Sequence, residues 1–334
     1  LFRQEWHVAM RFRRPFALLG LLLWAGLAAA EPATKSIPEP PAAVTKAQPE
    51  SIADLKAFQK QTRAVIDKVI PATVCLRVGA ASGSGVIVSR DGLIMTAGHV
   101  SGEPGRKIKI VLHDGKTVDG ETLGFGPAID SGMARITTPG EWPYCEVGAA
   151  KDLKSGQWVI ATGHPGGYKK GRSPVVRVGR VGLRDDRAVQ SDCTLVGGDS
   201  GGPLFDMSGK VVGIHSRIGQ AIAANIHVPS DTYRDTWDQL VKSEIVGVSP
   251  YFGVTKDEDA KECKLAAVTP GSPAAEAGFK AGDVITRFDG KDVANYDEMV
   301  KMLQAQKPLA RVTIEVLRKD EVKELKVKIG WRRS

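Results

Sequence analysis

The stretch GGDSGGPLFDMSGKVVGIHS, residues 197 to 216, decides the fold of this chain. It frames Ser200 with four glycines and then runs into two short apolar segments separated by a turn. One interpretation of the glycine-rich part is a tight surface turn, for which Gly, Asp and Ser are the usual residues. The other is an exposed nucleophile, whose small neighbours leave room for a substrate carbonyl and aim backbone N–H groups at its oxygen.

The segment after Ser200 separates two serine-nucleophile architectures. Gly198, Ser200 and Gly202 match the G-x-S-x-G elbow of α/β-hydrolases, which requires a helix directly after the serine and a histidine far downstream. Here the segment 203–214 predicts a strand and a turn, and no histidine lies beyond residue 227. The elbow is therefore excluded, and the order histidine, aspartate, serine on two β-barrels remains.

The residues from Pro71 to about Pro229 have the composition of an all-β domain. Short runs of β-branched residues alternate with Gly, Asp and Pro turns, as in TVCLRV, GVIVS, IKIVLH, MARIT, WVIATG, VVRVGRVG and VVGIHS. Many short strands at this density predict an antiparallel sandwich or barrel. No strong helical pattern interrupts them, so loops and strand ends must carry the chemistry.

A serine nucleophile almost always uses a histidine as its base. His99 is the strongest candidate among the six histidines, because residues 83–100 predict two strands joined by a turn and then a small-residue corner that presents the imidazole. His7 falls in an N-terminal leader. The others are expected to be structural or solvated, namely His113, His164, His215 and His227.

A third group should orient the imidazole and stabilise its charged form. Asp130 immediately precedes a predicted short strand, whose entrance would bury the carboxylate. Asp114 and Asp119 are rivals, but both have the setting of hairpin-turn residues. Asp130 is therefore the predicted acid.

These motifs resemble the trypsin-like serine proteases of the HtrA (Deg) family. The resemblance covers about residues 75 to 330, and its motifs are GSGVIVSRDGLIMTAGHV (83–100), ATGHPGG (161–167), GGDSGGPLFD (197–206) and GKVVGIHS (209–216). The intervals of 31 residues from His99 to Asp130 and of 70 from Asp130 to Ser200 suit that family. One departure is the SGM after Asp130, where the family more often has an apolar residue directly after the aspartate.

The resemblance implies a mainly β chain, with a chymotrypsin-like double β-barrel protease domain followed by an α+β PDZ domain. Ser200 is expected to attack a peptide carbonyl while His99 moves its proton and Asp130 holds the imidazole in the needed tautomer. Backbone N–H groups at Gly198, Asp199 and Ser200 are expected to form the oxyanion hole. No cofactor, metal or ATP is expected to take part.

Substrate preference is predicted from Thr194, which lies six residues before the nucleophile. Trypsin-like enzymes that cut after Lys or Arg have a carboxylate at this position, so cleavage after small or medium apolar residues is expected here. The segment 213–216 is expected to pair with the substrate backbone as an added strand. The predicted substrate-binding residues are Thr194, Ile214, His215, Ser216 and Ile226.

A helix and linker are expected from Thr236 to Ser249, after which the pattern changes to that of a PDZ domain. Its groove is expected between the strand after Val254 and the helix around residues 296–305, and it would hold a peptide by strand addition. The alternative is a domain that only packs on the protease. The predicted loop that binds a peptide's C-terminal carboxylate is Tyr251, Phe252, Gly253 and Val254.

The chain begins with a basic stretch and an apolar run from Phe16 to Ala30, the order of a secretory signal. Fifteen apolar residues are short for a membrane span, which needs about 20, so cleavage is favoured over an anchor. A periplasmic or secreted protein is expected, membrane-associated if the signal is uncleaved. The predicted division is a signal peptide at 1–30 with an upstream extension at 1–9, a Pro-rich linker at 31–50, an accessory helix at 51–70, a trypsin-like serine protease domain at 71–245 and a PDZ domain at 250–332.

Composition argues against a nucleic-acid site. The formal net charge is +8, of which residues 1–30 contribute +3, so about +5 remains. Lys and Arg are scattered without aromatic interleaving. The cysteines lack metal-ligand spacing, and their disulfide pairing stays open, although a bridge between the first two is conceivable; they are Cys75, Cys145, Cys193 and Cys263.

Two classes of function follow. The first is an exported, ATP-independent serine endopeptidase that acts on unfolded or C-terminally recognised proteins, with peptide C-termini as partners of the PDZ domain. The second is a catalytically silent chaperone or binding protein in which the PDZ module is the working part. The intact set of His99, Asp130 and Ser200 favours the enzyme, and the family resemblance implies a homotrimer or a higher homo-oligomer.

Overall fold

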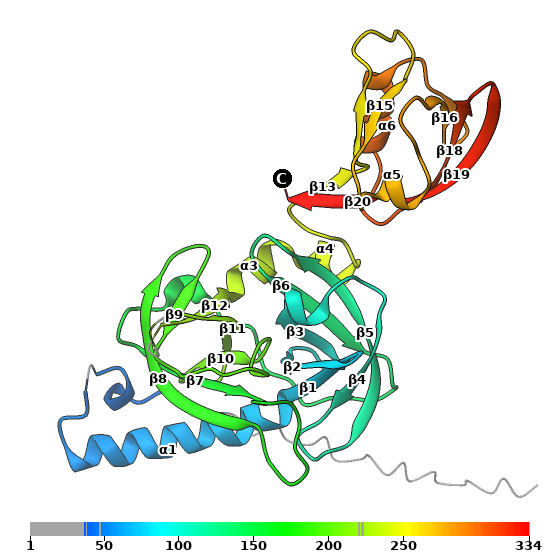
Figure 1. Ribbon diagram of the computed structural model, residues 1–334. Coiled ribbons are helices and arrows are strands. Elements are labelled where there is room, and N and C mark those ends of the chain that lie inside the picture. The colour runs from blue at the N-terminus through cyan, green and yellow to red at the C-terminus, as the bar shows by residue number, and fades with distance from the viewer. Residues whose placement is uncertain (1–36, 38, 47, 220, 222–223, 334) are drawn as a thin grey trace, which may run out of the picture. The chain divides into compact units, whose positions relative to one another are not determined.

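The computed structural model describes residues 37, 39–46, 48–219, 221 and 224–333. The predicted signal peptide and the first part of the predicted linker lie outside the described residues. The predicted fold class is confirmed, because two closed β-barrels are followed by a smaller domain of strands and helices (Figure 1).

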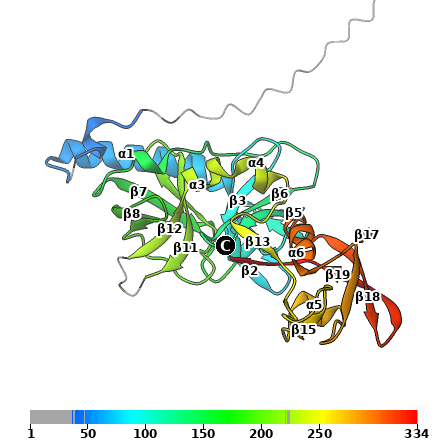
Figure 2. The same ribbon diagram turned by 90° about the horizontal axis from the view of Figure 1, so that it is seen from above.

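Helix α1 (Ile52–Val69) precedes the barrels, after a short 3-10 turn at Ala42–Val44. Ser51 caps its N-terminus by accepting a hydrogen bond from the Asp54 N–H. Val65 and Val69 are fully buried against the barrel core, and the Gln61 amide donates to the carbonyl of Met207 at 2.8 Å. Both views show α1 along the outside of the barrels (Figures 1 and 2).

The first barrel forms from the β-branched runs that the sequence pattern assigned to strands. Its strands follow the closed order β1-β2-β3-β6-β5-β4. After β3 the chain turns into the short helix α2 (Gly98–Ser101). The strands are β1 (Thr73–Val78), β2 (Ala81–Ile87), β3 (Leu93–Ala97), β4 (Lys107–Val111), β5 (Thr117–Gly126) and β6 (Ser131–Ile136).

The second barrel repeats this design in the closed order β10-β11-β12-β9-β8-β7. Its strands are β7 (Trp158–Gly163), β8 (Val175–Arg184), β9 (Val189–Ser191), β10 (Pro203–Asp206), β11 (Val211–Ile218) and β12 (Asn225–Pro229). A 3-10 turn (Ala150–Asp152) lies between the barrels in sequence. The helix expected from residue 236 begins earlier, because α3 (Ser230–Asp235) and α4 (Trp237–Val241) follow β12 directly.

The C-terminal domain has its own hydrophobic core, in which Phe252, Phe288 and Ile314 are almost completely buried. It contains a four-stranded sheet in the order β17-β16-β18-β19 and the two-stranded pairs β13-β20 and β14-β15. The strands are β13 (Val248–Tyr251), β14 (Val254–Lys256), β15 (Leu265–Val268), β16 (Val284–Phe288), β17 (Lys291–Asp292), β18 (Arg311–Arg318), β19 (Glu321–Lys328) and β20 (Gly330–Arg333). The helices are α5 (Pro273–Glu276) and α6 (Tyr296–Gln304).

The cysteine side chains are buried thiols, so the conceivable bridge between Cys75 and Cys145 is not formed. Burial raises the pKa of Cys145 and Cys263 to about 12, which keeps these thiols protonated and unreactive. Of the helices in the described part of the chain, none has the length and apolar character needed to span a bilayer.

Candidate active site

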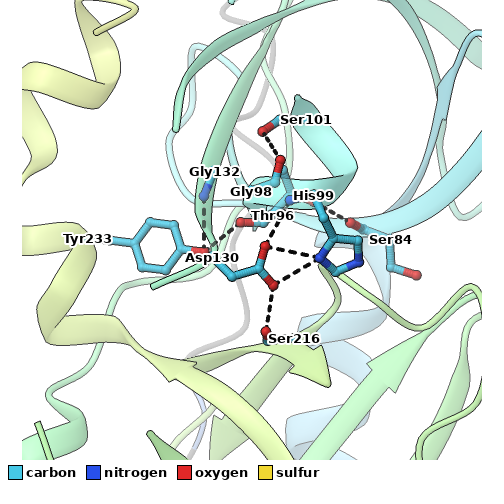
Figure 3. Close-up of polar contacts among 9 residues, drawn as sticks. All are labelled: Ser84, Thr96, Gly98, His99, Ser101, Asp130, Gly132, Ser216 and Tyr233. Carbon is cyan, nitrogen blue, oxygen red and sulfur yellow. Dashed lines mark hydrogen bonds and ion pairs between the residues drawn. The ribbon is translucent and has the colours of Figure 1, made fainter. Parts of the chain in front are cut away.

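His99 lies in α2, directly after the end of β3, and its imidazole meets the carboxylate of Asp130. The distances from Nδ1 are 2.9 Å to Oδ2 and 3.0 Å to Oδ1 (Figure 3). The backbone N–H of His99 also donates to Oδ1 at 2.8 Å. The carboxylate therefore fixes both the start of the helix and the orientation of the ring.

The backbone of Asp130 is held in an unusual conformation at the entrance of β6. Its φ is 69°, in the left-handed region that Asp tolerates better than most residues. Its N–H donates to the carbonyl of Gly126, and its carbonyl accepts from the N–H of Gly98, both at 2.8 Å. These bonds hold the carboxylate against the imidazole.

A third hydrogen-bond donor to the Asp130 carboxylate comes from the second barrel. The hydroxyl of Ser216, on β11, donates to Oδ2 at 2.5 Å (Figure 3). Ser216 is almost completely buried, so little water competes for this bond. The hydroxyl orients the acid, and the substrate-binding role predicted for the backbone of this residue stays a prediction.

These contacts determine the protonation of the pair. Burial alone would raise the pKa of Asp130, but the hydrogen bonds from His99 and Ser216 bring it below its ordinary value. The hydrogen bond to Asp130 raises the pKa of His99 above its ordinary 6.5, against the opposing effect of burial. The carboxylate accepts from Nδ1, so the neutral ring carries its proton there and keeps a lone pair on Nε2.

The glycine of the SGM after Asp130 has a steric explanation. A Cβ at Gly132 would lie 2.4 Å from Oγ of the buried Ser101 and 2.7 Å from the carbonyl oxygen of Ala97. Strand β6 passes so close to the start of α2 that only glycine fits. This steric constraint acts on Gly132, whereas the residue that departs from the family pattern is Ser131, directly after Asp130.

Ser200 lies where the two barrels meet. A Cβ at Gly201, whose φ is 84°, would approach Thr96 Oγ1 to 2.2 Å and the Ser84 carbonyl oxygen to 2.3 Å. The Ser200 carbonyl accepts the N–H of Ser84 at 2.8 Å. The glycine after the serine thus allows the serine loop to rest on Ser84 of β2 and Thr96 of β3, and Thr96 lies three residues before His99.

The backbone of Ser200 lies close to the residue that follows His99. A Cβ at Gly83 would touch both Val100, the neighbour of His99, and the carbonyl of Ser200. Within the described part of the chain no hydrogen bond joins Nε2 of His99 to Oγ of Ser200. Catalytic hydrogen bonds are often long before substrate binds and shorten in the complex.

Two backbone N–H groups near Ser200 are available to a developing oxyanion. Those of Gly198 and Ser200 donate to no acceptor among the described residues. The N–H of Asp199 instead donates to the Val196 carbonyl at 3.1 Å, and its predicted contribution to the hole stays a prediction. The geometry leaves two candidate donors on either side of Asp199.

Ser84 supports this loop, and the sequence analysis did not single it out. Its hydroxyl donates to the Gly198 carbonyl at 2.8 Å and accepts the His164 N–H at 2.9 Å. Gly166 adds a hydrogen bond to the carbonyl of Gly197 at 2.7 Å. Nothing in a GSG tripeptide marks such a role, because the contact joins segments more than a hundred residues apart.

The segment 213–216, predicted to pair with the substrate backbone, lies within β11. Ile214 is buried and paired on both sides, with Pro203 and Val228, so it offers no free edge. His215 donates its N–H to Gly202 and accepts from Gly201. The backbone of this part of β11 is therefore already hydrogen-bonded within the barrel, and the substrate-binding role predicted for these two residues stays a prediction. After His215, Arg217 and Ile218 of β11 pair with Ile226 and Asn225 of β12.

The remaining predicted pocket residues lie near this edge. Thr194 is exposed in the segment that follows β9. Ile226 is partly exposed on β12, paired with Arg217 of β11. Neither position carries a negative charge.

The other histidines are structural or solvated, as expected. His227 Nδ1 and His215 Nδ1 are 2.9 Å apart, His215 Nε2 bonds the Thr162 carbonyl, and Ser191 Oγ lies 2.7 Å from His227 Nε2. Because a carbonyl only accepts, His215 must carry its proton on Nε2, and His227 donates to it from Nδ1. Burial lowers the pKa of His227 to about 3, so this hydrogen-bonded series of side chains stays neutral.

His164 is buried as well, and His113 is exposed. Burial lowers the pKa of His164 to about 4, so its ring is neutral at ordinary pH. Of the rivals to Asp130, Asp114 accepts from the N–H of Lys116 in a turn, and Asp119 lies in β5 with an exposed ion pair to Lys109. No cluster of His, Cys, Asp or Glu suited to a metal ion occurs in residues 37–333 as far as they are described.

The C-terminal domain contains a groove of about 380 Å³ beside the predicted carboxylate loop. It is lined by β13, by the loop Tyr251 to Val254 and by α6. Thr269 donates to the carbonyl of Gly253, so the polar groups of the next residue, Val254, point to the opposite edge of β14. There the hydroxyl of Tyr296 donates to the Val254 carbonyl at 2.9 Å.

Two family descriptions match the chain. Residues 83–214 match a trypsin-like peptidase domain, and residues 250–329 match a PDZ domain. A probable periplasmic serine endoprotease, DegP-like, of Brucella suis is 32% identical over 275 residues, which are 75% of this chain and 52% of that protein. A protein of Pseudomonas fulva with the same description is 29% identical and covers 84% of this chain and 64% of its own length.

The chain spans about half the length of the first of these relatives. Among solved structures, a serine endoprotease from Yersinia pestis is 22% identical, with a TM-score of 0.49, and covers 80% of this chain and 97% of its own. The HtrA-type protease AlgW with a tripeptide is 22% identical, with a TM-score of 0.48, over 81% of this chain and 97% of its own.

Proposed function

Because the chain belongs to the HtrA (Deg) family of trypsin-like serine proteases with one C-terminal PDZ domain, we propose that it is a serine endopeptidase. The observation that carries the proposal is the pair His99–Asp130, which leaves a lone pair on Nε2 of His99 beside the loop of Ser200. We assign the protease to residues 71–245 and the PDZ domain to residues 250–332.

The reaction begins when Nε2 of His99 takes the proton of the Ser200 hydroxyl while the oxygen attacks a peptide carbonyl. Asp130, held by Ser216, stabilises the imidazolium that forms. The imidazolium then gives the proton to the leaving amine, and a water molecule repeats the sequence to release the acyl group. The result is hydrolysis of one peptide bond.

The N–H groups of Gly198 and Ser200 stabilise the negative charge on the substrate oxygen. In serine proteases one such donor contributes about 2.7 to 4 kcal/mol to the barrier. Ser84 supports this role because it fixes the carbonyl of Gly198 and thereby the orientation of the neighbouring peptide groups.

The substrate is an extended protein segment that pairs with the open edge of β11 from Ser216 to Ile218. The uncharged Thr194 and the partly exposed Ile226 favour a small or medium apolar side chain before the cleaved bond. Unfolded or partly folded proteins present such segments, and hydrolysis by this site needs neither ATP nor a metal.

The PDZ domain binds the C-termini of peptides. The edge of β14 can pair with a peptide, and the backbone of the Tyr251 to Val254 loop can receive its carboxylate. Arg332 adds a positive charge to the lining, with its guanidinium 6.0 Å from the Tyr251 ring. The expected partners are therefore proteins with apolar C-termini.

The protein acts in the periplasm or outside the cell, and residues 1–30 serve as its signal peptide. The descriptions of the relatives as periplasmic support this location. The protease domains assemble as a homotrimer or a higher homo-oligomer.

The test is mass spectrometry of casein fragments produced by the wild-type protein beside Ser200→Ala, with fluorophosphonate labelling in parallel. We expect fragments that end in small or medium apolar residues, labelling of Ser200, and loss of both in the variant. Fragmentation that persists in Ser200→Ala contradicts the assignment of the nucleophile. A wild-type protein that neither cuts nor labels, while still binding C-terminal peptides, points to a binding protein instead.

A further inference from the structure

Tyr233 of α3 is completely buried and reaches from the end of the second barrel into the first. It is among the largest fully buried side chains of the described residues, and it packs in the barrel core. Its hydroxyl donates to the carbonyl of Thr96, on β3, at 2.5 Å (Figure 3). The same oxygen accepts from the backbone N–H of Gly132, on β6, at 3.4 Å. One phenol hydroxyl therefore bonds both strands of the β3–β6 pair.

The two residues that Tyr233 bonds stand directly beside the His99–Asp130 pair. Thr96 and Gly132 face each other across the two strands. Thr96 lies three residues before His99, and Gly132 lies two residues after Asp130. A shift of one strand relative to the other at this point would therefore move the imidazole relative to the carboxylate.

Small residues build this junction. The strands pair Thr96 with Gly132 and Ala97 with Ser131. A Cβ at Gly132 would lie only 2.7 Å from the carbonyl oxygen of Ala97, so the two backbones are in close contact. Small side chains bury little apolar surface, whereas the ring of Tyr233 is a large buried group at this point.

Helix α3 is itself fixed to the segment that joins the two barrels. The hydroxyl of Ser230 donates to the carbonyl of Gly148 at 2.9 Å and accepts the N–H of Ala150 at 3.1 Å. The guanidinium of Arg234 donates to the same Gly148 carbonyl at 3.0 Å. Because Tyr233 lies between Ser230 and Arg234 in the helix, its hydroxyl is presented from a fixed base.

The Tyr233 hydroxyl keeps its proton. Burial raises the pKa of Tyr233 well above its ordinary value, and the negative charge of Asp130 acts in the same direction. The carbonyl of Thr96 can only accept, so the hydroxyl proton lies in that bond and a lone pair faces the N–H of Gly132. Both strands are therefore bonded at once.

We propose that Tyr233 is a positioning residue for the catalytic pair: its hydroxyl holds β3 and β6 at the spacing at which Nδ1 of His99 meets the carboxylate of Asp130. This inference rests on the proposed proteolytic function. Tyr233 acts through the backbones of Thr96 and Gly132. Without the hydroxyl the two strands can move apart, so the bonds of 2.9 and 3.0 Å from Nδ1 lengthen and the carboxylate stabilises the imidazolium less.

The test compares Tyr233→Phe, which removes only the hydroxyl, with the wild type in the full-length protein. The measurements are kcat, KM and the acid midpoint of kcat/KM on a short apolar peptide. We expect kcat to fall about tenfold and KM to change less than about twofold, because misplaced catalytic groups slow the reaction without weakening binding. The midpoint should move down toward 6.5, since Asp130 then raises the pKa of His99 less. Glu103 and Arg217, which line the same hollow as His99, are unchanged, so the midpoint reports on Asp130.

Val65→Ala is the matched control, because Val65 is a buried residue of α1 and its truncation also lowers stability. Its kcat and its acid midpoint should equal those of the wild type. A Tyr233→Phe protein with the wild-type kcat and midpoint overturns the inference, even if it melts earlier. A lower kcat with an unchanged midpoint overturns it too, because the effect would then not pass through the His99–Asp130 pair.

Tyr233→Met is a second variant without the hydroxyl, and it decides by the same outcomes if Tyr233→Phe does not fold. Failure of both variants to fold where Val65→Ala is folded would show a purely structural role and overturn the inference. A wild-type protein without peptidase activity contradicts the proposed function instead. The pKa of His99, measured by NMR in the Ser200→Ala background, then decides the inference: it should be lower with Tyr233→Phe, and an unchanged pKa overturns it.

Discussion

Ser216 of the second barrel forms a hydrogen bond to Asp130, the acidic residue of the first barrel. Asp130 enters β6 of the first barrel, whereas the hydroxyl that bonds its Oδ2 comes from β11 of the second. His99 and Asp130 both belong to the first barrel, and the hydrogen bond from Ser216 adds to that from His99 in lowering the pKa of Asp130 against the effect of burial. The active site is therefore complete only when the barrels have docked.

At the same scale, the pH profile of kcat/KM follows from the His99–Asp130 pair. His99 must be neutral to accept a proton, and Asp130 raises its pKa above 6.5, so activity should rise with pH through a midpoint above 6.5. In Asp130→Asn the midpoint should fall, because the anion that stabilised the imidazolium is gone. The maximum should fall by about 10⁴-fold as the wrong tautomer is favoured.

The profile is measured on a short peptide with wild-type and variant protein. His99 and Asp130 are both partly exposed, so the stability linked to this pair is a minor quantity. Its sign is definite: the charged pair stabilises the fold most below pH 6.5, and this stabilisation is lost as pH rises through the folded pKa of His99. An acid midpoint that is unchanged in Asp130→Asn would refute the assigned role.

At the scale of elements, the sequence predicted what local patterns determine. The β-branched runs became the barrel strands, and Ser51 before a helical pattern became the cap of α1. The pairing of β11 was missed, because which edge of a strand is occupied depends on β10 and β12, not on the strand itself. Tyr233 was missed for the same reason, since its partner Thr96 lies 137 residues away.

Helix α1 should contribute to the stability of the protease domain. Val65→Ala deletes two buried methyl groups and should lower the free energy of unfolding by about 1 to 3 kcal/mol. Ile52→Ala, on the same helix but with 73% of the residue exposed, should change it by less than about 0.5 kcal/mol. Urea unfolding followed by circular dichroism measures both. Equal effects of the two variants would show that α1 is not docked in solution.

The contact between α6 and β14 affects peptide binding. A peptide that pairs with β14 must displace the Tyr296 hydroxyl from the Val254 carbonyl. Tyr296→Phe removes this competing bond and keeps the ring, so affinity for an apolar C-terminal peptide should rise about two- to tenfold. Fluorescence anisotropy in the Ser200→Ala background measures it, with the half-exposed Tyr144→Phe as control. Weaker binding by Tyr296→Phe would mean that the hydroxyl contacts the peptide.

At the scale of the whole molecule, the chain combines two separately built cores. The core of the C-terminal domain consists of residues between 252 and 329, and the barrel core contains none of them. The residues of the proposed triad, His99, Asp130 and Ser200, and the proposed oxyanion donors all belong to the barrels. Each domain should therefore unfold as its own cooperative unit.

Phe288→Ala tests this independence, because Phe288 is 1% exposed in the C-terminal core. The loss of the ring should destabilise that domain by about 3 to 5 kcal/mol and abolish peptide binding, while fluorophosphonate labelling of Ser200 persists. Phe205→Ala, equally buried but in β10, should instead remove labelling. In calorimetry of Phe288→Ala, the smaller domain should unfold at a lower temperature than in the wild-type protein. The transition of the barrels should be unchanged. If Phe288→Ala abolished labelling at a temperature where the barrels remain folded, the catalytic loop would need the PDZ domain for its conformation, and the two cores would not be functionally independent.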